Sequence, residues 1–250
     1  MRNATLEQRA QAAQDAGFDG IGLFAGAYLA AIRNGATDDS LDELFNRCEI
    51  GVLELEALPM FRDDLLDLFV NLASRFDVHR VQTIAPFEGA VDRTAAAAWL
   101  ADAADRFAAS DTSLAIEFLP FTAIATARDA SELIERTRRD NVGMCVDAWH
   151  VFRGGGLDSL VAFAPEHVLS VQLDDGPLQP VLDNYIDDCL HHREVMGAGE
   201  FDLVGMMAML PKGVPLSIEV ADDDLDLLAP TDVAQQLAEA TRHLIHASPT

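Results

Sequence analysis

The chain has 250 residues, of which 50% are hydrophobic, so it is long enough to bury one large core. Its 42 acidic residues outnumber the 17 basic ones, which gives a formal net charge of −25. A chain this acidic repels phosphate backbones and anionic lipid headgroups. We therefore expect neither nucleic acid nor a membrane surface as a partner.

The cysteines and the first residues indicate the compartment. Cys48, Cys145 and Cys189 are odd in number, far apart and form no CxxC pair, which is typical of buried free thiols in a reducing cytoplasm. The polar start MRNATLEQRAQ predicts no signal peptide. The longest nearly apolar run, Ile21 to Ile32, is too short to span a bilayer. We expect a cytoplasmic protein.

Apolar runs and amphipathic helices alternate along the first half of the chain. Thr5-Leu-Glu-Gln8 has the spacing of a capping box, and it opens a helix that Gly17 ends. Asp92 is expected to cap a later, alanine-rich helix that runs to Phe107. Strands are predicted at 18–24, 50–55, 78–84 and 113–118, and further helices at 41–48 and 65–76.

The second half keeps this alternation. Strands are predicted at 142–146, 168–173 and 216–220, and helices at 130–138, 157–161, 203–210 and 231–244. The segment 174–200 shows neither period, and long loops of this kind are usually functional lids or disordered. No linker or change of composition divides the chain, so we expect one domain over residues 1–250.

Repeated βα units predict a parallel sheet, either a closed barrel or an open doubly wound sheet. Seven strands are one short of a (β/α)8 barrel, and the chain opens on a helix that would normally follow the first strand. Residues Met1–Asn3 could supply a stub of that strand, and otherwise the barrel has a gap. We expect a TIM-type (β/α)8 barrel and leave open whether its first strand is truncated or missing.

Side chains that can bind a metal stand at the ends of four predicted strands. They are Glu117 in LAIEFLP, Asp147 in CVDAWH, Gln172 in SVQLDD and Glu219 in LSIEV. A glutamate inside an apolar strand is costly to bury unless it is paired or coordinates a cation. Each carboxylate alone could instead be exposed at a strand terminus or paired with an arginine. The four together favour a site at the carboxyl edge of the sheet, where such strand ends meet.

The chain resembles the sugar phosphate isomerase/epimerase family of the xylose-isomerase-like barrel superfamily. The resemblance rests on Ile116-Glu117, Asp147-x-x-His150, Gln172-Leu-Asp-Asp, the run from Arg193 to Asp202, and Ile218-Glu219-Val220. It implies one divalent cation bound by Glu117, Asp147, Gln172 and Glu219. It also implies that His150 and Arg193 touch the substrate.

Two departures from the family pattern affect this expectation. Gln172 stands where many relatives have histidine, and its neutral amide oxygen is a weaker donor. Gly197-Ala-Gly199 replaces the more usual Pro-Gly-x-Gly, which should leave that turn less rigid. Three carboxylates and an amide oxygen favour Mn²⁺ or Mg²⁺ over zinc, with Co²⁺ as a substitute.

The resemblance and the strand ends together predict a metal-dependent isomerase or epimerase acting on a keto-sugar, polyol or related hydroxy-ketone. The cation would stabilise the enediolate that forms when the adjacent carbon loses its proton. Glu117 and Glu219 are expected on opposite sides of it, as base and acid. A lyase of the inosose dehydratase or 3-dehydroshikimate dehydratase type shares this first step and then expels a β-hydroxyl, with His150 as the acid.

Two further functions are weighed against the enzyme. An endonuclease of the same superfamily is rejected, because it needs a histidine-rich zinc site and a basic face, and this chain has 7 histidines and a net charge of −25. A degenerate barrel that binds a ligand or serves as a partner subunit stays open, and a failure to bind metal would favour it. A homodimer or larger homo-oligomer is expected, since barrels of this type commonly pair.

Other polar residues near the strand ends receive weaker assignments. The segment 174–200 is expected to fold over the metal and carry Arg193 to a substrate oxygen. Replacing Arg193 by Ala should then lower kcat/KM at least about tenfold with metal affinity little changed. Glu54 and Glu56 could line the pocket, but strand alternation is expected to let only one point inward. Arg153 beside three glycines could bind an anionic group of the substrate, or simply precede a turn.

Overall fold

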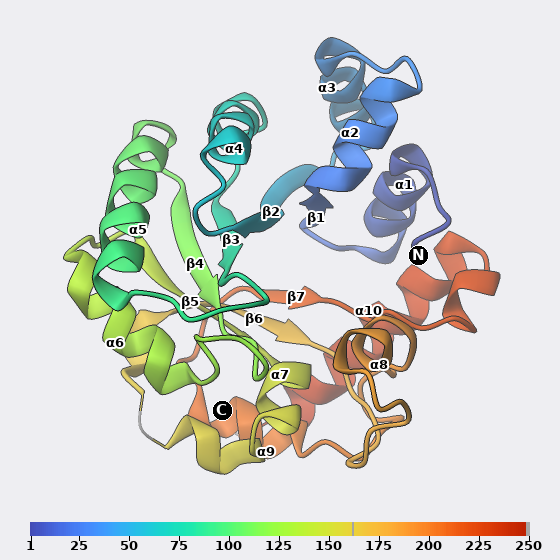
Figure 1. The fold of residues 1–250 in the computed structure, drawn as a ribbon. Coiled ribbons are helices and arrows are strands. Elements are labelled where there is room, and N and C mark those ends of the chain that lie inside the picture. Colours follow the sequence, from blue (N-terminus) through green and yellow to red (C-terminus); the bar gives the residue numbers. More distant parts are fainter. Residues whose placement is uncertain (162, 249–250) are drawn as a thin grey trace.

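Seven apolar runs form one parallel sheet in the computed structural model, which describes residues 1–161 and 163–248 (Figure 1). Each strand pairs with the next one along the chain, and every pair is parallel. The strands are β1 (Gly20–Phe24), β2 (Gly51–Pro59), β3 (Arg80–Ile84), β4 (Ser113–Glu117), β5 (Val142–Asp147), β6 (Val168–Leu173) and β7 (Leu216–Ile218). The prediction of seven strands in a TIM-type barrel is confirmed.

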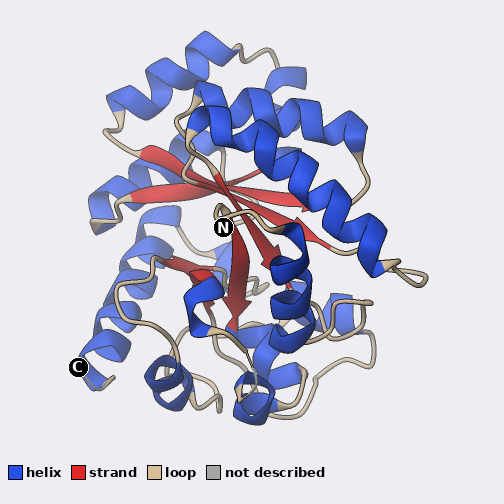
Figure 2. Cartoon of the chain, turned by 90° about the vertical axis from the view of Figure 1, so that its left-hand side faces the viewer, coloured by secondary structure: helices blue, strands red, loops and turns tan. Residues whose placement is uncertain are grey.

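Helices accompany this sheet, and most of them cover its outer face (Figure 2). They are α1 (Leu6–Ala16), α2 (Ala25–Arg33), α3 (Asp38–Arg47), α4 (Asp63–Arg75), α5 (Arg93–Phe107), α6 (Ala127–Thr137), α7 (Ala148–Arg153), α8 (Tyr185–His191), α9 (Leu203–Met209) and α10 (Pro230–Ala247). Both predicted caps are confirmed: Thr5 and Gln8 form a capping box on α1, and the Asp92 side chain accepts two backbone N–H groups of α5. Within the described residues, none of these helices has the length and hydropathy needed to cross a bilayer.

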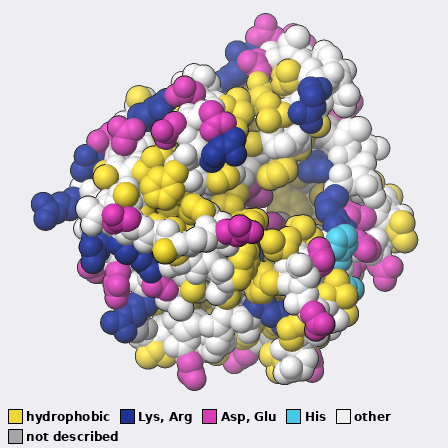
Figure 3. Space-filling model, viewed as in Figure 1, with side chains coloured by type: hydrophobic (Ala, Val, Ile, Leu, Met, Phe, Trp, Pro, Cys, Tyr) yellow, Lys and Arg dark blue, Asp and Glu magenta, His cyan; other side chains and the backbone are white. Residues whose placement is uncertain are grey.

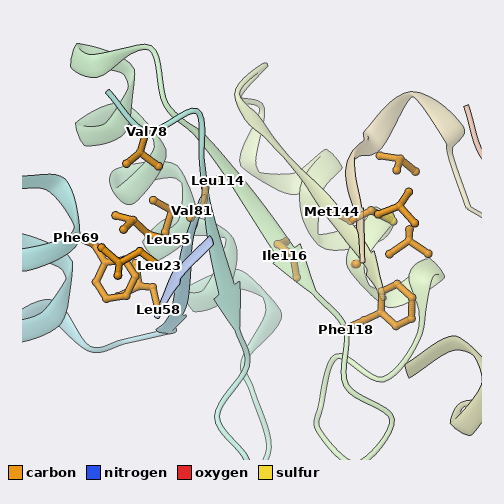
Figure 4. Close-up of a cluster of buried hydrophobic side chains, with 14 of the residues drawn as sticks. Leu23, Leu55, Leu58, Phe69, Val78, Val81, Leu114, Ile116, Phe118 and Met144 are labelled. Atoms are coloured by element: carbon orange, nitrogen blue, oxygen red, sulfur yellow. The ribbon is translucent and has the colours of Figure 1, made fainter. Parts of the chain in front are cut away.

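The apolar side chains of the strands pack outward against the helices (Figure 4). Leu55, Val81 and Leu114 come from three neighbouring strands, and each is fully buried in one cluster with Phe69 of α4. Because side chains alternate along a strand, Ala115 and Glu117 of β4 then point into the barrel while Leu114 and Ile116 face the helices. The polar residues of the strands are thus concentrated inside the barrel.

The barrel has a seam between its two edge strands. β1 pairs only with β2 and β7 only with β6 among the described residues. Outside the seam, α1 and α10 pack through Ala12, Ala16, Ala234 and Ala238. A cavity of about 1650 Å³ lies along it, lined by residues of β1, β7, α1 and α10.

The strand stub that the sequence allowed at Met1–Asn3 does not form, because these residues lie in a turn. Ion pairs hold them against the loop that follows β7. The terminal amine pairs with Asp226, and the Arg2 side chain pairs with Asp223 and Asp226. The first residues are therefore fixed at the end of the seam and do not run along it.

Buried carboxylates order the segment 174–200. Asp175 accepts backbone N–H groups from Gly176, Gly197 and Phe201 at 2.8–3.0 Å. Gly199 lies so close that a Cβ atom there would meet Asp175 Oδ1 at 2.4 Å. The prediction that this segment lacks secondary structure is wrong in part, since it contains α8. That helix has seven residues and buries little apolar surface, so its sequence shows no helical period.

Candidate active site

The ends of β4 and β5 bring three possible metal ligands together. Glu117 is the last residue of β4, and Asp147 is the last residue of β5. Asp147 Oδ1 accepts the backbone N–H of His150 at 3.2 Å, which caps α7 and turns His150 back toward the strand ends. One ligand atom from each of Glu117, Asp147 and His150 lies within 4.8 Å of the others, and all three side chains are buried.

Both ring nitrogens of His150 have partners. Nε2 lies 3.0 Å from Glu117 Oε1, and Nδ1 lies 2.6 Å from the hydroxyl oxygen of Tyr185. Tyr185 is the first residue of α8, so the segment 174–200 contributes it to the site. Burial raises the pKa of Tyr185, and the phenol therefore keeps its proton. No sequence pattern singled out this tyrosine.

A single nitrogen of Arg193 joins three carboxylates beside this triad. Its Nη1 donates to Asp147 Oδ2 at 2.9 Å and to Asp174 Oδ2, and it lies 3.2 Å from Glu219 Oε2. Nη1 also donates to the backbone oxygen of Glu219 at 3.1 Å. The guanidinium is buried, and its carbon lies 5.7 Å from the ring centroid of Trp149. Asp147 and Glu219, both predicted metal ligands, are thus neighbours through Arg193.

The protonation of these carboxylates follows from burial and from Arg193. Burial alone would raise the pKa of Asp147, but the charges of Arg193 and His150 outweigh it and lower that pKa to about 2. Burial raises the pKa of Asp174 well above its ordinary value. It also raises the pKa of Glu219, with Asp147 and Glu56 adding to the effect and Arg193 opposing it. Solvent weakens the burial effect at Glu219, because 39% of its side chain is exposed.

Gln172, the fourth predicted ligand, lies in a polar network inside the barrel. Its amide oxygen accepts from the thiol of Cys145 at 3.5 Å, and Gln82 donates to the same sulfur at 3.4 Å. Gln82 also donates to Glu54, which pairs with Arg80 at 3.0 Å. Gln172 lies directly opposite Asp147 where β5 pairs with β6, and its role as a ligand stays a prediction.

Glu54 and Glu56 both line the cavity along the seam, as does Glu219. The expectation that only one of the first two points inward is wrong, because residues two apart on a strand share a face. Burial, together with the charges of Glu54 and Glu117, raises the pKa of Glu56 to about 8. Figure 3 shows the surface hollowed near the centre of this face, between the region of α1 and α2 and that of α8. The buried triad does not line this cavity, whereas Glu219 does.

Arg153 does not face the site. It donates to the backbone oxygen of Pro177 at 2.6 Å and pairs with Asp188 at 3.3 Å, with its guanidinium over the Trp149 ring. Asp188 also accepts the backbone N–H groups of Val181 and Leu182. These contacts anchor the segment 174–200, so the substrate contact considered for Arg153 has no support.

A divalent cation fits the donor set of the triad. Two carboxylates and one imidazole nitrogen are close enough to share one ion, and they are at the ends of a parallel barrel where metal sites are commonly built. Histidine ligands usually donate their second ring N–H to an oxygen, and the Tyr185 hydroxyl is placed to accept it. Glu117, Asp147 and His150 would hold the ion.

These features define a parallel TIM-type barrel with a candidate metal triad at its strand ends. The chain belongs to the xylose isomerase-like TIM barrel family, whose model matches residues 10–244. A curated relative, the 3-dehydroshikimate dehydratase of Pseudomonas aeruginosa, is 28% identical over 241 residues. That match covers 88% of this chain and 37% of the relative, so the chain spans little more than a third of that protein.

Solved structures share the fold. The IolI protein with a bound zinc atom has a TM-score of 0.86 and 20% identity, with 99% of this chain and 95% of that chain covered. The probable 3-dehydroshikimate dehydratase AsbF of Bacillus anthracis has a TM-score of 0.76 and 15% identity, covering 96% and 94%. The D-psicose 3-epimerase of Clostridium cellulolyticum H10 has a TM-score of 0.70 and 13% identity, covering 99% and 95%.

Replacing Tyr185 by Phe is expected to lower kcat about tenfold, because His150 would lose the hydrogen bond that fixes its ring. The free energy of unfolding should fall by about 1 kcal/mol. Tyr28→Phe is the matched control. Tyr28 donates to Asp38 at 2.7 Å and does not line the cavity, so loss of its hydroxyl should leave kcat unchanged. Steady-state rates and urea unfolding measure both effects. Equal rates for the two variants would contradict the assignment.

The pKa of Glu56 predicts a pH dependence of stability. Its folded-state pKa of about 8 exceeds the ordinary unfolded value, so between about pH 4.5 and 8 the folded state binds more protons. The metal-free protein should therefore lose stability as pH rises through this window. Glu56→Gln should reduce that loss by about 1 kcal/mol in urea unfolding at pH 5 and 8. Glu43→Gln, at an exposed position of α3, should leave the profile unchanged.

Proposed function

We propose that this chain is a divalent-metal-dependent enzyme that isomerises or epimerises a small keto-sugar, polyol or related hydroxy-ketone by removing the proton next to its carbonyl group. One arrangement carries the proposal. A buried set of metal-type ligands, Glu117, Asp147 and His150, lies next to a carboxylate, Glu219, that is partly exposed at a large cavity. The similarity to a D-psicose 3-epimerase structure and to the IolI protein supports this class of chemistry.

A bound divalent cation would supply electrostatic stabilisation for the negative charge that develops on the carbonyl oxygen. The four ligands predicted from the sequence all bind through oxygen, and for that reason Mn²⁺ or Mg²⁺ was expected. The triad instead combines two carboxylates with an imidazole, a set that also suits Zn²⁺ and Co²⁺. The zinc atom in the similar IolI structure supports including Zn²⁺. We keep Mn²⁺ as the first candidate and test Zn²⁺ beside it.

Two carboxylates would move the proton. Glu219 reaches the cavity, and its raised pKa suits a group that takes a proton from carbon and returns it. Glu117, whose Oε1 lies 3.0 Å from His150 Nε2, is the second carboxylate that the sequence predicts for proton transfer, although it does not line the cavity that Glu219 reaches. Tyr185 would hold the His150 ring in place.

Dehydration is the second candidate function. It is favoured by the curated relative, a 3-dehydroshikimate dehydratase 28% identical to this chain. The first proton transfer would be the same, and His150 would then protonate the leaving hydroxyl group. Because this chain covers 37% of that relative, dehydratase activity is carried over to this chain as a proposal.

The test follows solvent deuterium into the substrate. Metal-free protein reloaded with Mn²⁺ or Zn²⁺ is incubated in D2O with keto-sugars, inososes and 3-dehydroshikimate, and the products are observed by NMR. Deuterium at the carbon next to the carbonyl supports the proposal, and loss of water identifies the lyase. Exchange that is equally fast with metal-free protein, or absent from the whole panel, counts against it.

The assembly expected from the sequence, a homodimer or larger, belongs to the same proposal. Exposed apolar side chains of the segment 174–200 support it, with exposures of 37–54%: Leu178, Val181, Leu182, Ile186 and Leu190. Light scattering at micromolar concentration measures the mass. A monomer there would contradict this part of the proposal.

A further inference from the structure

The Nη1 atom of Arg193 occupies a position suited to a metal ion. Four oxygen atoms surround it: Asp147 Oδ2, Asp174 Oδ2, Glu219 Oε2 and the backbone oxygen of Glu219. Carboxylate and carbonyl oxygens are the donors that hard divalent cations prefer. The second oxygen of Asp174, Oδ1, is buried and has no hydrogen-bond partner.

The guanidinium therefore uses oxygens that a cation would need. Asp147 Oδ2 is 2.9 Å from Nη1 and belongs to the triad with Glu117 and His150. Glu219 was expected from the sequence to be a ligand as well. A carboxylate oxygen that binds a divalent cation forms a weaker ion pair with a nearby arginine. A divalent cation and a guanidinium that share one carboxylate also repel each other.

Two further contacts hold the Arg193 side chain in this position. Its Nε donates to the backbone oxygen of Cys189 at 3.3 Å, and Nη2 lies 3.1 Å from the sulfur of the same residue. The side chain is 3% exposed, and its guanidinium carbon lies over the Trp149 ring, 5.7 Å from the ring centroid.

We propose that Arg193 is an internal counter-cation that competes with the divalent metal for Asp147 and Glu219. The inference rests on the metal binding within the proposed function. Without metal, the guanidinium neutralises a cluster of carboxylates that would otherwise repel one another inside the barrel. Metal binding loosens its ion pair with Asp147 and makes the guanidinium available to the substrate side of the cluster.

This changes the expectation drawn from the sequence, in which Arg193 leaves metal affinity unaffected. Removing the guanidinium takes away a positive charge beside the metal position and frees two carboxylate oxygens. Metal affinity should rise. The metal-free protein should lose stability at the same time, because buried carboxylates lose their partner.

The experiment compares Arg193→Met with wild-type protein by calorimetric titration of Mn²⁺ into stripped protein without substrate. Arg193→Met should bind Mn²⁺ at least about tenfold more tightly, which corresponds to about 1.4 kcal/mol. Its metal-free Tm should be lower and its Tm gain on adding Mn²⁺ larger. Arg93→Met is the matched control. It breaks the half-buried pair between Arg93 of α5 and Asp129 of α6 at 2.7 Å and should lower Tm with Mn²⁺ affinity unchanged.

Equal or weaker Mn²⁺ binding by Arg193→Met overturns the proposal, and so does a failure of both proteins to bind Mn²⁺. If the variant does not fold, wild-type protein labelled with ¹⁵N-arginine is titrated with Mg²⁺ or Zn²⁺. The buried Arg193 side-chain signal should shift and exchange faster with solvent, and an unmoved signal overturns the proposal. Tighter binding by the variant without turnover of any substrate in the wild type would reject the proposed function alone.

Discussion

Glu219→Gln is expected to lower kcat about 10³-fold, the largest effect of any single change in this chain. Glutamine keeps the shape of the side chain but cannot accept a proton, and general base catalysis contributes about 10²–10⁴-fold in typical enzymes. Glu219 is the carboxylate of the cluster that lines the cavity, so it is the one that substrate can reach. The rate of solvent deuterium exchange into substrate should fall with kcat, because both require the same proton transfer.

The matched control is Glu132→Gln, which makes the same chemical change on α6, where Glu132 pairs with Arg128 at the surface. It should leave kcat and exchange unchanged. Glu219→Gln should fold, because Arg193 retains Asp147 and Asp174 as partners. Circular dichroism and Tm test this. Exchange at the wild-type rate in folded Glu219→Gln would show that another group is the base.

The strand order and the polar strand ends could be predicted because both depend on local sequence. Val142–Asp147 and Val168–Leu173 are apolar runs bounded by turns, and alternation within them assigns each side chain to a face. Glu117 and Asp147 follow directly, since the carboxyl ends of neighbouring parallel strands meet. The capping box at Thr5 was visible for the same reason, as it involves residues three apart.

Helices without a clear apolar stripe escaped prediction. α2 covers Ala25–Arg33, and its alanine-rich and apolar residues continue straight from β1, so the sequence reads as one unbroken apolar run. α7 has six residues, begins at the cap that Asp147 provides and buries Ala148 to Val151, so it is too short to show a helical period. In both, packing against the rest of the protein stabilises a helix that the sequence alone does not reveal.

Contacts between residues far apart in the chain could not be predicted from the sequence. Arg193 lies 46 residues from Asp147 and 26 from Glu219, and no spacing rule joins them. The sequence analysis considered an arginine partner for each strand-end carboxylate separately, but one guanidinium contacts two of them, Asp147 and Glu219, together with Asp174. The Tyr185–His150 contact could not be predicted for the same reason, because it depends on how the segment 174–200 folds back across the strand ends.

Asp147→Asn is expected to weaken Mn²⁺ binding at least about 100-fold, because Asp147 supplies charge to the triad and to Arg193 together. Asparagine retains the side-chain oxygen that caps α7, so the helix should persist. The metal-free protein should lose about 2 kcal/mol of unfolding free energy at pH 7. This is below the usual cost of breaking a buried ion pair, because Asp174 and Glu219 still hold Arg193.

The pH dependence of this loss has a definite sign. The pKa of Asp147 is lowered to about 2 in the folded state, below the ordinary value of an aspartate, so its contribution is present above about pH 4 and disappears as pH falls through about 2. The stability difference between wild type and Asp147→Asn should therefore be full at pH 7 and shrink below pH 4. Asp129→Asn is the matched control. Asp129 of α6 pairs with Arg93 at 2.7 Å away from the triad, so its loss should lower stability with Mn²⁺ affinity intact. Wild-type Mn²⁺ affinity in folded Asp147→Asn would remove Asp147 from the metal site.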